Sequence, residues 1–330
     1  MGHVPVLLDE VVTALEPKDG ETYADGTFGG GGYALRVLGA ANCKVIGIDR
    51  DLDAISRAEI LSEKEPRLTP LLGRFGDMDA LLLNNGVQNV QGVMLDIGVS
   101  SFQLDEAERG FSFMRHGPLD MRMGRSGPSA ADVVNTLDEQ NLITVIRQLG
   151  EEKQARRIGG AIVARRAEKP FQTTLDLADT IETAVGGRRG KKTHSATLTF
   201  QALRMFVNDE LGELARGLAA AERMLAPGGR LVVVTFHSLE DRLVKTFMRA
   251  RSGLGGGGSR YLPEREKGPD PTFFMPSKKA IEPSEAETTA NPRARSARLR
   301  VAIRAEAPFW KTPVETGVNV PDLKVVGVAA

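Results

Sequence analysis

Four consecutive glycines, Gly29 to Gly32, follow a short strand-like run that ends at an acid, Asp25. Glycine tolerates positive φ and lets the backbone come close to a bound molecule, and a helix beginning near Tyr33 would direct its first amides at an anionic group. Asp49 closes the next apolar run, at the place where a nucleotide-binding βαβ unit carries the carboxylate for the ribose hydroxyls. The stretch predicts a loop that binds a nucleotide-containing cofactor.

Two cofactors fit this loop, and a structural turn without a ligand is a third interpretation. Gly29, Gly31 and Ala34 satisfy the loose spacing of nicotinamide-binding loops. Asp25 stands directly ahead of the loop, where enzymes that use S-adenosylmethionine (SAM) commonly carry an acid. Phe75 follows the third expected strand, where an aromatic ring could meet an adenine. These last two features favour SAM.

The composition indicates a globular protein without disulfides or a metal site. Its 330 residues, 41% of them hydrophobic, suffice for one large domain or two of ordinary size. Cys43 is the only cysteine and the four histidines are scattered, so we expect no metal. The formal net charge is zero, which leaves nucleic-acid binding to local patches. A signal peptide and a membrane-length apolar run are both lacking, so we expect a cytoplasmic protein with no membrane contact.

Strands and helices alternate through the first part of the chain. A helix is expected over residues 5–16. Four strands are expected after it, over residues 21–25, 43–49, 67–73 and 92–96. This order predicts a parallel sheet, whose ligands lie at the carboxyl ends of its strands. Four residues fall at or just past such ends: Asp25, Asp49, Phe75 and Asp96.

A mostly helical segment interrupts this alternation after Asp96. Its expected helices cover residues 130–135, 138–149, 152–168 and 174–185, the last with Thr174 as N-cap. Residues 147–192 hold 11 Lys and Arg against 6 Asp and Glu, and a basic link covers 186–192. This surplus is either a solvated helix face or an RNA-facing surface.

The alternating pattern then resumes. We expect a long helix over 198–225, a buried strand within 227–236 and a flexible loop over 251–275. Near the end, apolar residues alternate with arginines over 297–304, which predicts a strand with one apolar and one basic face. The chain is thus expected to be α/β, with a Rossmann-like core interrupted by a helical insert. The core would comprise residues 1–104 and 197–330, and the insert residues 105–196.

Motifs along nearly the whole chain resemble one family, the bacterial 16S ribosomal RNA N4-cytosine methyltransferases, or small-subunit methyltransferase H family. Three of them are Asp25-Gly-Thr-Phe-Gly-Gly-Gly-Gly32, Leu95-Asp-Ile-Gly-Val-Ser-Ser101 and Phe236-His-Ser-Leu-Glu-Asp-Arg242. The others are residues 3–10, 47–51, 103–105, 109–113, 117–123, 150–152, 199–204 and 291–297. Any one motif could arise by chance, but the whole set in this order is specific.

The resemblance implies a class I SAM-dependent methyltransferase fold, with SAM as cofactor. The implied reaction is methylation of the N4 amine of a cytosine, position 1402 in the family, in 16S rRNA of the small ribosomal subunit. The insert would recognise the substrate, and the oligomeric state stays open, with a homodimer as one option. The loop and the resemblance together give the expected cofactor contacts: Gly29, Gly31, Gly32, Tyr33, Asp49, Phe75, Asp96 and Gln103.

This chain departs from the family pattern at two places. The family usually has histidine at the position of Tyr33, and commonly has His-Pro-Ala-Thr where residues 194–197 read His-Ser-Ala-Thr. The first departure leaves a contact from the Tyr33 side chain open, although its backbone amide can still serve. The second changes only the start of a helix.

Asp96 is the candidate catalytic residue. Cytosine N4 is a poor nucleophile because its lone pair is delocalised into the ring, so a group that accepts hydrogen bonds from the amine would stabilise the transition state. Asp96 begins Asp96-Ile-Gly-Val after the fourth expected strand, where amino-directed methyltransferases commonly place an acid-containing loop. The alternative is a pure SAM ligand, and neither role needs a metal or a covalent intermediate.

Five residues are candidates for contact with the RNA: Arg109, Phe111, Arg122, Arg204 and Arg242. The arginines would bind phosphates and the phenylalanine would stack on a base, with salt bridges and core packing as the structural alternatives. His237 is either a proton acceptor or a hydrogen-bonded structural histidine. Three other functions stay open: a SAM enzyme acting on DNA or protein, a nicotinamide oxidoreductase, which is disfavoured because no Tyr-x-x-x-Lys accompanies the loop, and an RNA-binding assembly factor.

Overall fold

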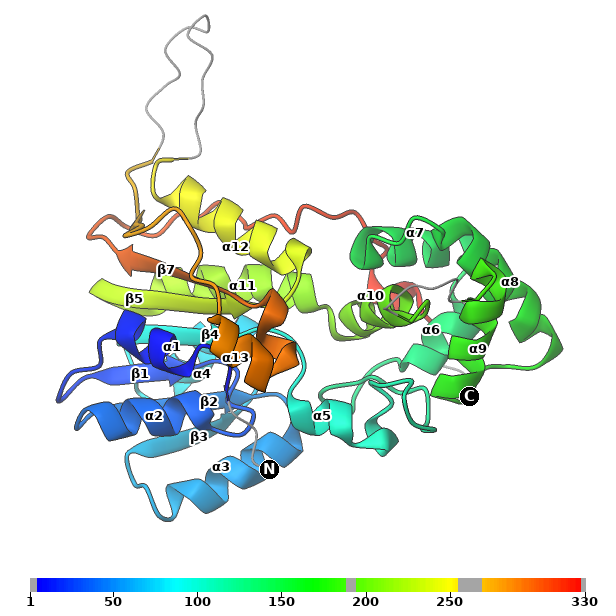
Figure 1. Ribbon diagram of the computed structural model, residues 1–330. Coiled ribbons are helices and arrows are strands. Elements are labelled where there is room, and N and C mark those ends of the chain that lie inside the picture. The colour runs from blue at the N-terminus through cyan, green and yellow to red at the C-terminus, as the bar shows by residue number, and fades with distance from the viewer. Residues whose placement is uncertain (1–4, 188–193, 255–268, 328–330) are drawn as a thin grey trace, which may run out of the picture. The chain divides into compact units, whose positions relative to one another are not determined.

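The computed structural model describes residues 5–187, 194–254 and 269–327, which form two compact units (Figure 1). The sheet unit comprises Met1–Gly98 and Leu211–Thr316, and the helical unit comprises Val99–Glu210 and Gly317–Ala330. Both expected insert boundaries, before residue 105 and after residue 196, fall inside the helical unit. Within the described parts of the chain, no helix is long and apolar enough to cross a membrane.

A seven-stranded sheet with the order β3-β2-β1-β4-β5-β7-β6 forms the centre of the sheet unit. The strands are β1 (Thr22–Asp25), β2 (Lys44–Asp49), β3 (Leu68–Leu72), β4 (Val90–Asp96), β5 (Leu225–Thr235), β6 (Phe273–Phe274) and β7 (Arg298–Arg304). The first five strands pair in parallel, whereas β7 lies antiparallel to β5 and β6. The structure confirms the expected parallel sheet, with strand bounds that differ by only a few residues.

The strand register brings three acids to one edge of the sheet. Asp25, the last residue of the central strand β1, lies opposite Gly47 of β2 and Met94 of β4. Asp49 and Asp96 each follow two residues later on those neighbouring strands. The loops after β1, β2 and β4 therefore start side by side, at the carboxyl edge where parallel sheets bind their ligands.

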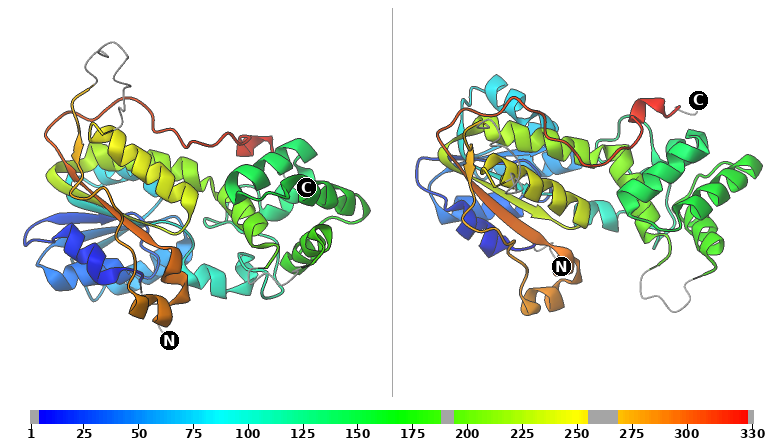
Figure 2. Two further views of the ribbon diagram at one scale, coloured as in Figure 1. Left: turned by 45° about the horizontal axis from the view of Figure 1, so that its top comes forward. Right: turned by 90° about the horizontal axis from the view of Figure 1, so that it is seen from above.

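Helices cover both faces of the sheet. They are α1 (Leu8–Leu15), α2 (Gly32–Ala40), α3 (Leu52–Ser62), α4 (Met78–Asn84), α11 (Glu210–Met224), α12 (Ser238–Arg251) and α13 (Glu285–Ala290). Helices α1 and α2 lie on one face, and α11 and α12 lie on the other (Figure 2). Apolar residues of α1 and α2, such as Val11, Leu15 and Val37, are buried against Tyr23 and Met94 of the sheet. Burial of one aliphatic side chain contributes about 1.5–3 kcal/mol to the stability of the fold. This packing therefore holds α2 in a defined position on the sheet.

The helical unit contains six α-helices among its described residues: α5 (Ser101–Asp105), α6 (Ala130–Thr136), α7 (Glu139–Gly150), α8 (Ala155–Glu168), α9 (Thr174–Val185) and α10 (Thr197–Asn208). Thr173, and not Thr174 as expected, caps α9, because its hydroxyl accepts a hydrogen bond from the Asp176 amide at 3.3 Å. Thr174 is buried and donates its own hydroxyl to the Arg115 carbonyl at 3.0 Å. Residues 188–192 of the expected basic link lie outside the described residues.

One expectation about the second half is wrong, and another needs a qualification. The long helix expected over 198–225 is two helices, because Asp209 adopts the left-handed conformation (φ 50°) and ends α10. Strand β7 has the expected arginine face, on which Arg298 is exposed, but the other two arginines are held within the protein. Arg300 donates two hydrogen bonds to Asp241, at 2.7 and 3.1 Å, and Arg304 is buried among backbone carbonyls.

The loop expected over 251–275 is described only in part. Helix α12 continues to Arg251, and Phe273 and Phe274 form the edge strand β6. Residues 255–268 of that loop lie outside the described residues.

Candidate active site

The glycine loop runs from β1 into α2 and takes a conformation that only glycine accepts easily. Gly29 and Gly31 have φ angles of 53° and 76°. A β-carbon at Gly31 would lie 2.6 Å from the ring of Phe28, far inside van der Waals contact. Gly31 is the N-cap residue of α2 and supplies no side-chain acceptor. No N-cap side chain therefore satisfies the first amides of α2, and a helix start of this kind attracts an anionic group such as a carboxylate.

Asp49 fastens the glycine loop to the end of β2. Its Oδ2 accepts a hydrogen bond from the Gly29 amide at 2.8 Å, and its Oδ1 accepts one from the Asp51 amide at 2.8 Å. Burial raises the pKa of Asp49, and these two amides partly offset the increase. Each carboxylate oxygen keeps a second lone pair, so the predicted contact with ribose hydroxyls stays compatible with this position. Asp51, and not Asp49, caps the helix that follows.

Phe75 lies in the short 3₁₀ turn Phe75–Asp77 after β3, as the sequence predicted. Its ring packs closely on α11, since a β-carbon at Gly217 would lie 2.4 Å from the ring. Phe75 also lies close to the loop after β1, since a β-carbon at Gly26 would lie 3.0 Å from the Phe75 β-carbon. The side chain is partly exposed. Its predicted contact with an adenine stays a prediction.

Asp25 and Asp96 form a linked pair at the ends of β1 and β4. Thr27 joins them, because its amide donates to Asp25 Oδ1 at 3.1 Å and its hydroxyl oxygen accepts the Asp96 amide at 2.7 Å. Among the described residues, neither Asp25 Oδ2 nor Asp96 Oδ1 has a hydrogen-bond partner, although both atoms are buried. Such orphaned acceptors are costly unless a ligand satisfies them.

The protonation of these two acids reflects their surroundings. Burial is the main cause that raises the pKa of Asp25 to about 7. Burial also raises the pKa of Asp96 to about 8, with further increases from the charges of Asp25 and Glu240. The Tyr33 hydroxyl lowers the pKa of Asp96 and so acts in the opposite direction. The site concentrates negative charge, so a positively charged ligand would lower both pKa values and favour the ionised acids.

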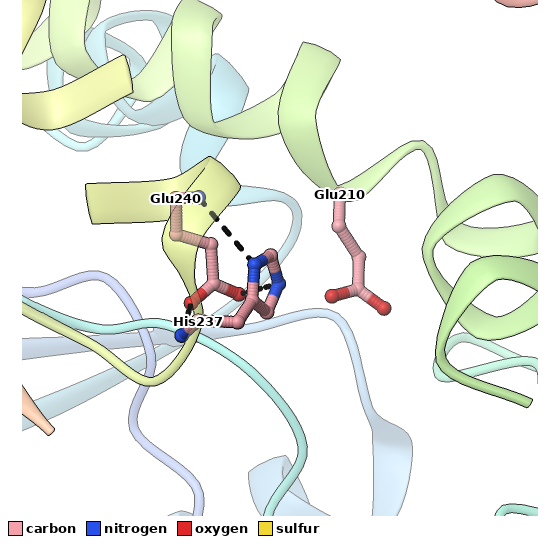
Figure 3. Close-up of side chains that lie close together, drawn as sticks. All are labelled: Glu210, His237 and Glu240. Atoms are coloured by element: carbon pink, nitrogen blue, oxygen red, sulfur yellow. Dashed lines mark hydrogen bonds and ion pairs between the residues drawn. The ribbon is translucent and has the colours of Figure 1, made fainter. Parts of the chain in front are cut away.

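His237 and Glu240 stand at the start of α12, just past β5 (Figure 3). His237 caps the helix: its Nδ1 accepts the Glu240 amide at 3.5 Å, and its Nε2 lies 2.7 Å from Glu240 Oε1. Glu240 Oε2 accepts the amides of Phe236 and His237, at 2.9 and 3.2 Å. These contacts favour the structural interpretation of His237.

Three site residues were not among the expected cofactor contacts: Asp25, Thr27 and Glu240. Asp25 and Thr27 belong to the Asp25-Gly-Thr-Phe motif, which signalled the loop but not the bond between Thr27 and β4. Glu240 is fully buried and acts on Asp96 through its charge. No sequence pattern predicts this interaction, because residues 96 and 240 are brought near each other only by the folding of the sheet.

Gln103 and the predicted RNA contacts Arg109, Phe111, Arg122 and Arg204 lie in the helical unit. The Gln103 side chain accepts the Ser100 amide at 3.1 Å and closes the capping box of α5. Arg109 is buried and donates to the Met123 carbonyl at 2.9 Å. Both residues have structural roles, and their predicted ligand contacts stay predictions.

The other predicted RNA contacts differ in how far they are free to meet a ligand. Arg122 is paired with Asp120, and Arg204 with Glu210, each through two hydrogen bonds of 2.7–2.8 Å. Phe111 is buried, with the Arg109 guanidinium 5.8 Å from its ring centre. Arg242, on α12 of the sheet unit, is exposed. All the contacts described for these residues are within the protein, and their predicted contacts with RNA stay predictions.

The sheet order, the antiparallel β7, the glycine loop and the acids at the strand ends define a class I SAM-dependent methyltransferase. A family model described as "MraW methylase family" matches residues 1–305, and the chain belongs to this family. This confirms the predicted fold class, the enzyme class and SAM as cofactor. The acidic pair Asp25 and Asp96 fits SAM, which carries a positive sulfonium and an ammonium group.

Curated relatives match over nearly their whole length. A protein of Hyphomonas neptunium is 64% identical over 322 residues, which are 98% of this chain and 94% of the relative. A protein of Caulobacter vibrioides is 57% identical over 309 residues, 94% of this chain and 97% of the relative. Both are named ribosomal RNA small subunit methyltransferase H.

Proposed function

We propose that this protein transfers the SAM methyl group to N4 of a cytosine in the 16S rRNA of the small ribosomal subunit. The single observation that carries the proposal is the pair Asp25 and Asp96, each with a buried carboxylate oxygen that has no partner among the described residues, at the carboxyl edge of the sheet. These acids suit a cationic cofactor and an acceptor that offers N–H groups. The names of the relatives support the choice of small-subunit rRNA.

The chain offers a matching group for each part of SAM. The amides at the start of α2 would hold the carboxylate of SAM, and Asp49 would accept the ribose hydroxyls. Phe75 would pack on the adenine. Asp25 would face the positive charge, which would stabilise its ionised form. When bound, SAM supplies an electrophilic methyl group.

Asp96 would act on the acceptor. Its Oδ1 is free to accept a hydrogen bond from the N4 amine, which localises the nitrogen lone pair and stabilises the positive charge that develops there. As the new C–N bond forms, N4 must lose a proton, and Asp96, whose ionised form the positive charge of SAM favours, is a suitable acceptor for it. Positioning of the two substrates would supply much of the remaining acceleration.

The helical unit would contact the RNA backbone through exposed basic side chains that form no hydrogen bond or ion pair with the described residues. Arg147, Lys153, Arg156 and Arg157 are exposed at the end of α7 and the start of α8. These four side chains form no hydrogen bond or ion pair with any described residue. Arg156 and Arg157 occupy the first turn of α8, where the helix dipole disfavours cations and where no acid balances them. We call these four residues the α7–α8 cation patch.

Nearby arginines show the contrast with the patch. Arg165 pairs with Asp176 through two 3.0 Å hydrogen bonds, and Arg166 donates to the carbonyls of Val134 and Leu137 at 2.7 Å. The basic surplus of this region is thus part structural and part available for phosphates. Two acids, Glu151 and Glu152, adjoin the patch in sequence and reduce its charge without cancelling it.

The test is to incubate the purified protein with methyl-labelled SAM and small ribosomal subunits from cells that lack the activity, followed by nucleoside analysis of the rRNA. Label in N4-methylcytidine supports the proposal. Binding of SAM without label in that nucleoside means that the acceptor is a different one. Binding of the rRNA without binding of SAM would support the alternative of an RNA-binding assembly factor.

A further inference from the structure

Glu213 of α11 is a buried acid that contacts two arginines within the sheet unit. Its Oε2 accepts a hydrogen bond from Nη1 of Arg50 at 2.8 Å, and Nη1 of Arg74 lies 3.6 Å from the same oxygen. Only 2% of the Glu213 side chain is exposed, compared with 13% for Arg50 and 40% for Arg74. One carboxylate thus faces two cations in a partly buried place, where charges interact more strongly than at an open surface.

Both arginines directly adjoin the residues that are proposed to hold adenosine. Arg50 follows Asp49, the proposed partner of the ribose hydroxyls. Arg74 precedes Phe75, the proposed partner of the adenine. The two cations that Glu213 contacts therefore stand beside the proposed adenosine site.

The pairing of β2 with β3 brings these two positions together. Asp49 lies opposite Leu72, and the Gly73 amide donates a hydrogen bond to the Asp49 carbonyl at 2.9 Å. The arginines are the next residues along the chain after Asp49 and Gly73. Their proximity is thus a consequence of the strand register.

The turn that carries Phe75 also packs on α11. A β-carbon at Gly76 would lie 3.2 Å from Cγ of Glu213, and one at Gly217 would lie 2.4 Å from the Phe75 ring. Residues 213 and 217 are four apart and so lie on the same face of the helix. This close packing holds the Glu213 carboxylate beside the two arginines.

We propose that Glu213 is a specificity-determining residue: by binding Arg50 and Arg74, it keeps the adenosine site from accepting adenine nucleotides that carry a phosphate on the ribose. In nucleotide-binding folds of this kind, an arginine near the ribose acid accommodates a ribose phosphate. Glu213 offsets the positive charge that such a phosphate would need. SAM carries no phosphate and has a net positive charge, so Glu213 does not disfavour it.

The glycine loop alone does not make this distinction, because it also satisfies the loose spacing of nicotinamide-binding loops. A group outside the loop must therefore disfavour phosphate-bearing nucleotides. The inference rests on the placement of adenosine in the proposed function and does not depend on which acceptor is methylated.

The alternative is that Glu213 only ties α11 to the loops after β2 and β3. A matched ion pair stands at the other end of α11, where Arg223 donates to Asp79 of α4 at 2.7 Å. Residues 213 and 223 are about 15 Å apart along the helix, and Arg223 lies next to the start of β5, away from the carboxyl edge. Asp79→Asn therefore removes the partner of a cation of α11 without affecting the adenosine site.

The experiment measures the affinities for adenosine and for adenosine 2′-monophosphate by calorimetry in the unchanged protein and in the variants. These ligands differ only in the phosphate, so the ratio of their affinities isolates its contribution. A purely structural role of Glu213 would lower both affinities alike and leave the ratio unchanged. Arg57 of α3, which donates to the Gly29 carbonyl at 3.4 Å, is also near this edge but is the same in every variant.

We expect Glu213→Gln to raise the relative affinity for adenosine 2′-monophosphate about 10-fold or more, because both arginines then lack their acid. Arg50→Gln combined with Glu213→Gln should lose most of this gain. Asp79→Asn should keep the ratio of the unchanged protein.

Arg74→Gln tests the inference in the opposite direction and does not depend on whether Glu213→Gln folds, since loss of one partner of a buried ion pair is destabilising. Arg74 is 40% exposed, so its replacement should leave the fold intact. Glu213 would then offset one cation instead of two, and the relative affinity for adenosine 2′-monophosphate should fall about 3-fold or more.

Four results would overturn the inference. One is a folded Glu213→Gln variant with the ratio of the unchanged protein, and another is an equal rise of the ratio in Asp79→Asn. The third is a double variant that keeps the whole gain, which would mean that Arg50 does not bind the phosphate. The fourth is a ratio in Arg74→Gln that stays the same or rises.

Failure of the proposed function would look different. These titrations contain no RNA, so a protein that methylates another acceptor would give the same ratios. A wrong placement of adenosine would appear as an adenosine affinity that Asp49→Asn does not change. Failure of the inference alone would leave adenosine binding weakened in Asp49→Asn and the ratio unchanged in Glu213→Gln.

Discussion

The amide of Gly29 donates a 2.8 Å hydrogen bond to Oδ2 of Asp49, so the end of β2 holds the glycine loop in place. The same carboxylate is the predicted partner of the ribose hydroxyls. The Asp49 carboxylate therefore stabilises the glycine loop even in the protein without ligand. A substitution that keeps the shape but removes the charge should affect the loop and the cofactor together.

We therefore expect Asp49→Asn to weaken SAM binding at least about 10-fold and to lower the free energy of unfolding by about 1–2 kcal/mol. The asparagine can accept only through one oxygen, whereas Asp49 accepts amides through both. Calorimetric titration with SAM and thermal unfolding measure the two effects.

Asp19→Asn is the matched control. Asp19 accepts the Asn42 amide at 2.7 Å, also between two loops, but it precedes β1 and so stands away from the carboxyl edge. The Asp19→Asn variant should leave SAM affinity unchanged. Equal SAM affinity for Asp49→Asn and the unchanged protein would contradict the ribose role of Asp49.

The positions of the strand-end residues could be predicted from the sequence. The hydrogen bonds and charge interactions between them could not. Short apolar runs that end in an acid mark β1, β2 and β4, because a buried parallel strand leaves its polar residues for the edge. The break at Asp209 has no such local signal, since aspartate adopts the left-handed conformation only occasionally. The pairing of Arg300 on β7 could not be predicted either, because its partner Asp241 lies far away in sequence.

Binding of SAM should release protons near neutral pH. The pKa of Asp96 is about 8 and that of Asp25 about 7 in the protein without ligand, so at pH 7 Asp96 is mostly protonated. A bound cation lowers both pKa values, and the acids then lose protons to the buffer. Titrations in two buffers of different ionisation enthalpy measure the number released.

Asp96→Asn should reduce the proton release at pH 7, because asparagine does not titrate. A release unchanged by this substitution would mean that the SAM charge does not act on Asp96. A normal SAM affinity combined with a loss of methyl transfer in the same variant would favour the acceptor role of Asp96 over the pure ligand role.

The stability of the ligand-free protein should fall as pH rises from about 4 to about 8. The usual pKa of an aspartate is 3.8 and that of Asp96 in the fold is about 8, so between these values the folded state holds a proton that the unfolded state releases. Asp96→Asn removes this cost and should raise the free energy of unfolding at pH 8 by about 1 kcal/mol or more. Thermal unfolding across this range measures the change.

Asp120→Asn should change the free energy of unfolding at pH 8 in the opposite direction. Arg122 holds the pKa of Asp120 below its usual value, so the ionised acid stabilises the fold above pH 4 and that stability is lost on acidification. Removing its charge should lower stability at pH 8. If both variants changed stability in the same direction at pH 8, the assignment of raised and lowered pKa values would be wrong.

The α7–α8 cation patch should govern affinity for the RNA and its salt dependence. Each phosphate contact that is lost lowers the slope of log affinity against log salt by about 1, so Arg156→Ala with Arg157→Ala should lower it by about 2 and weaken rRNA binding several-fold. SAM affinity should not change, because neither residue belongs to the sheet unit.

Lys44→Ala with Lys64→Ala is the control: it removes the same charge from exposed positions of the sheet unit, at the start of β2 and after α3. Filter binding of rRNA across a salt series compares the two pairs. A patch variant that behaves like this control would show that the RNA docks elsewhere, while a loss confined to the patch variant would assign α7 and α8 to the RNA backbone.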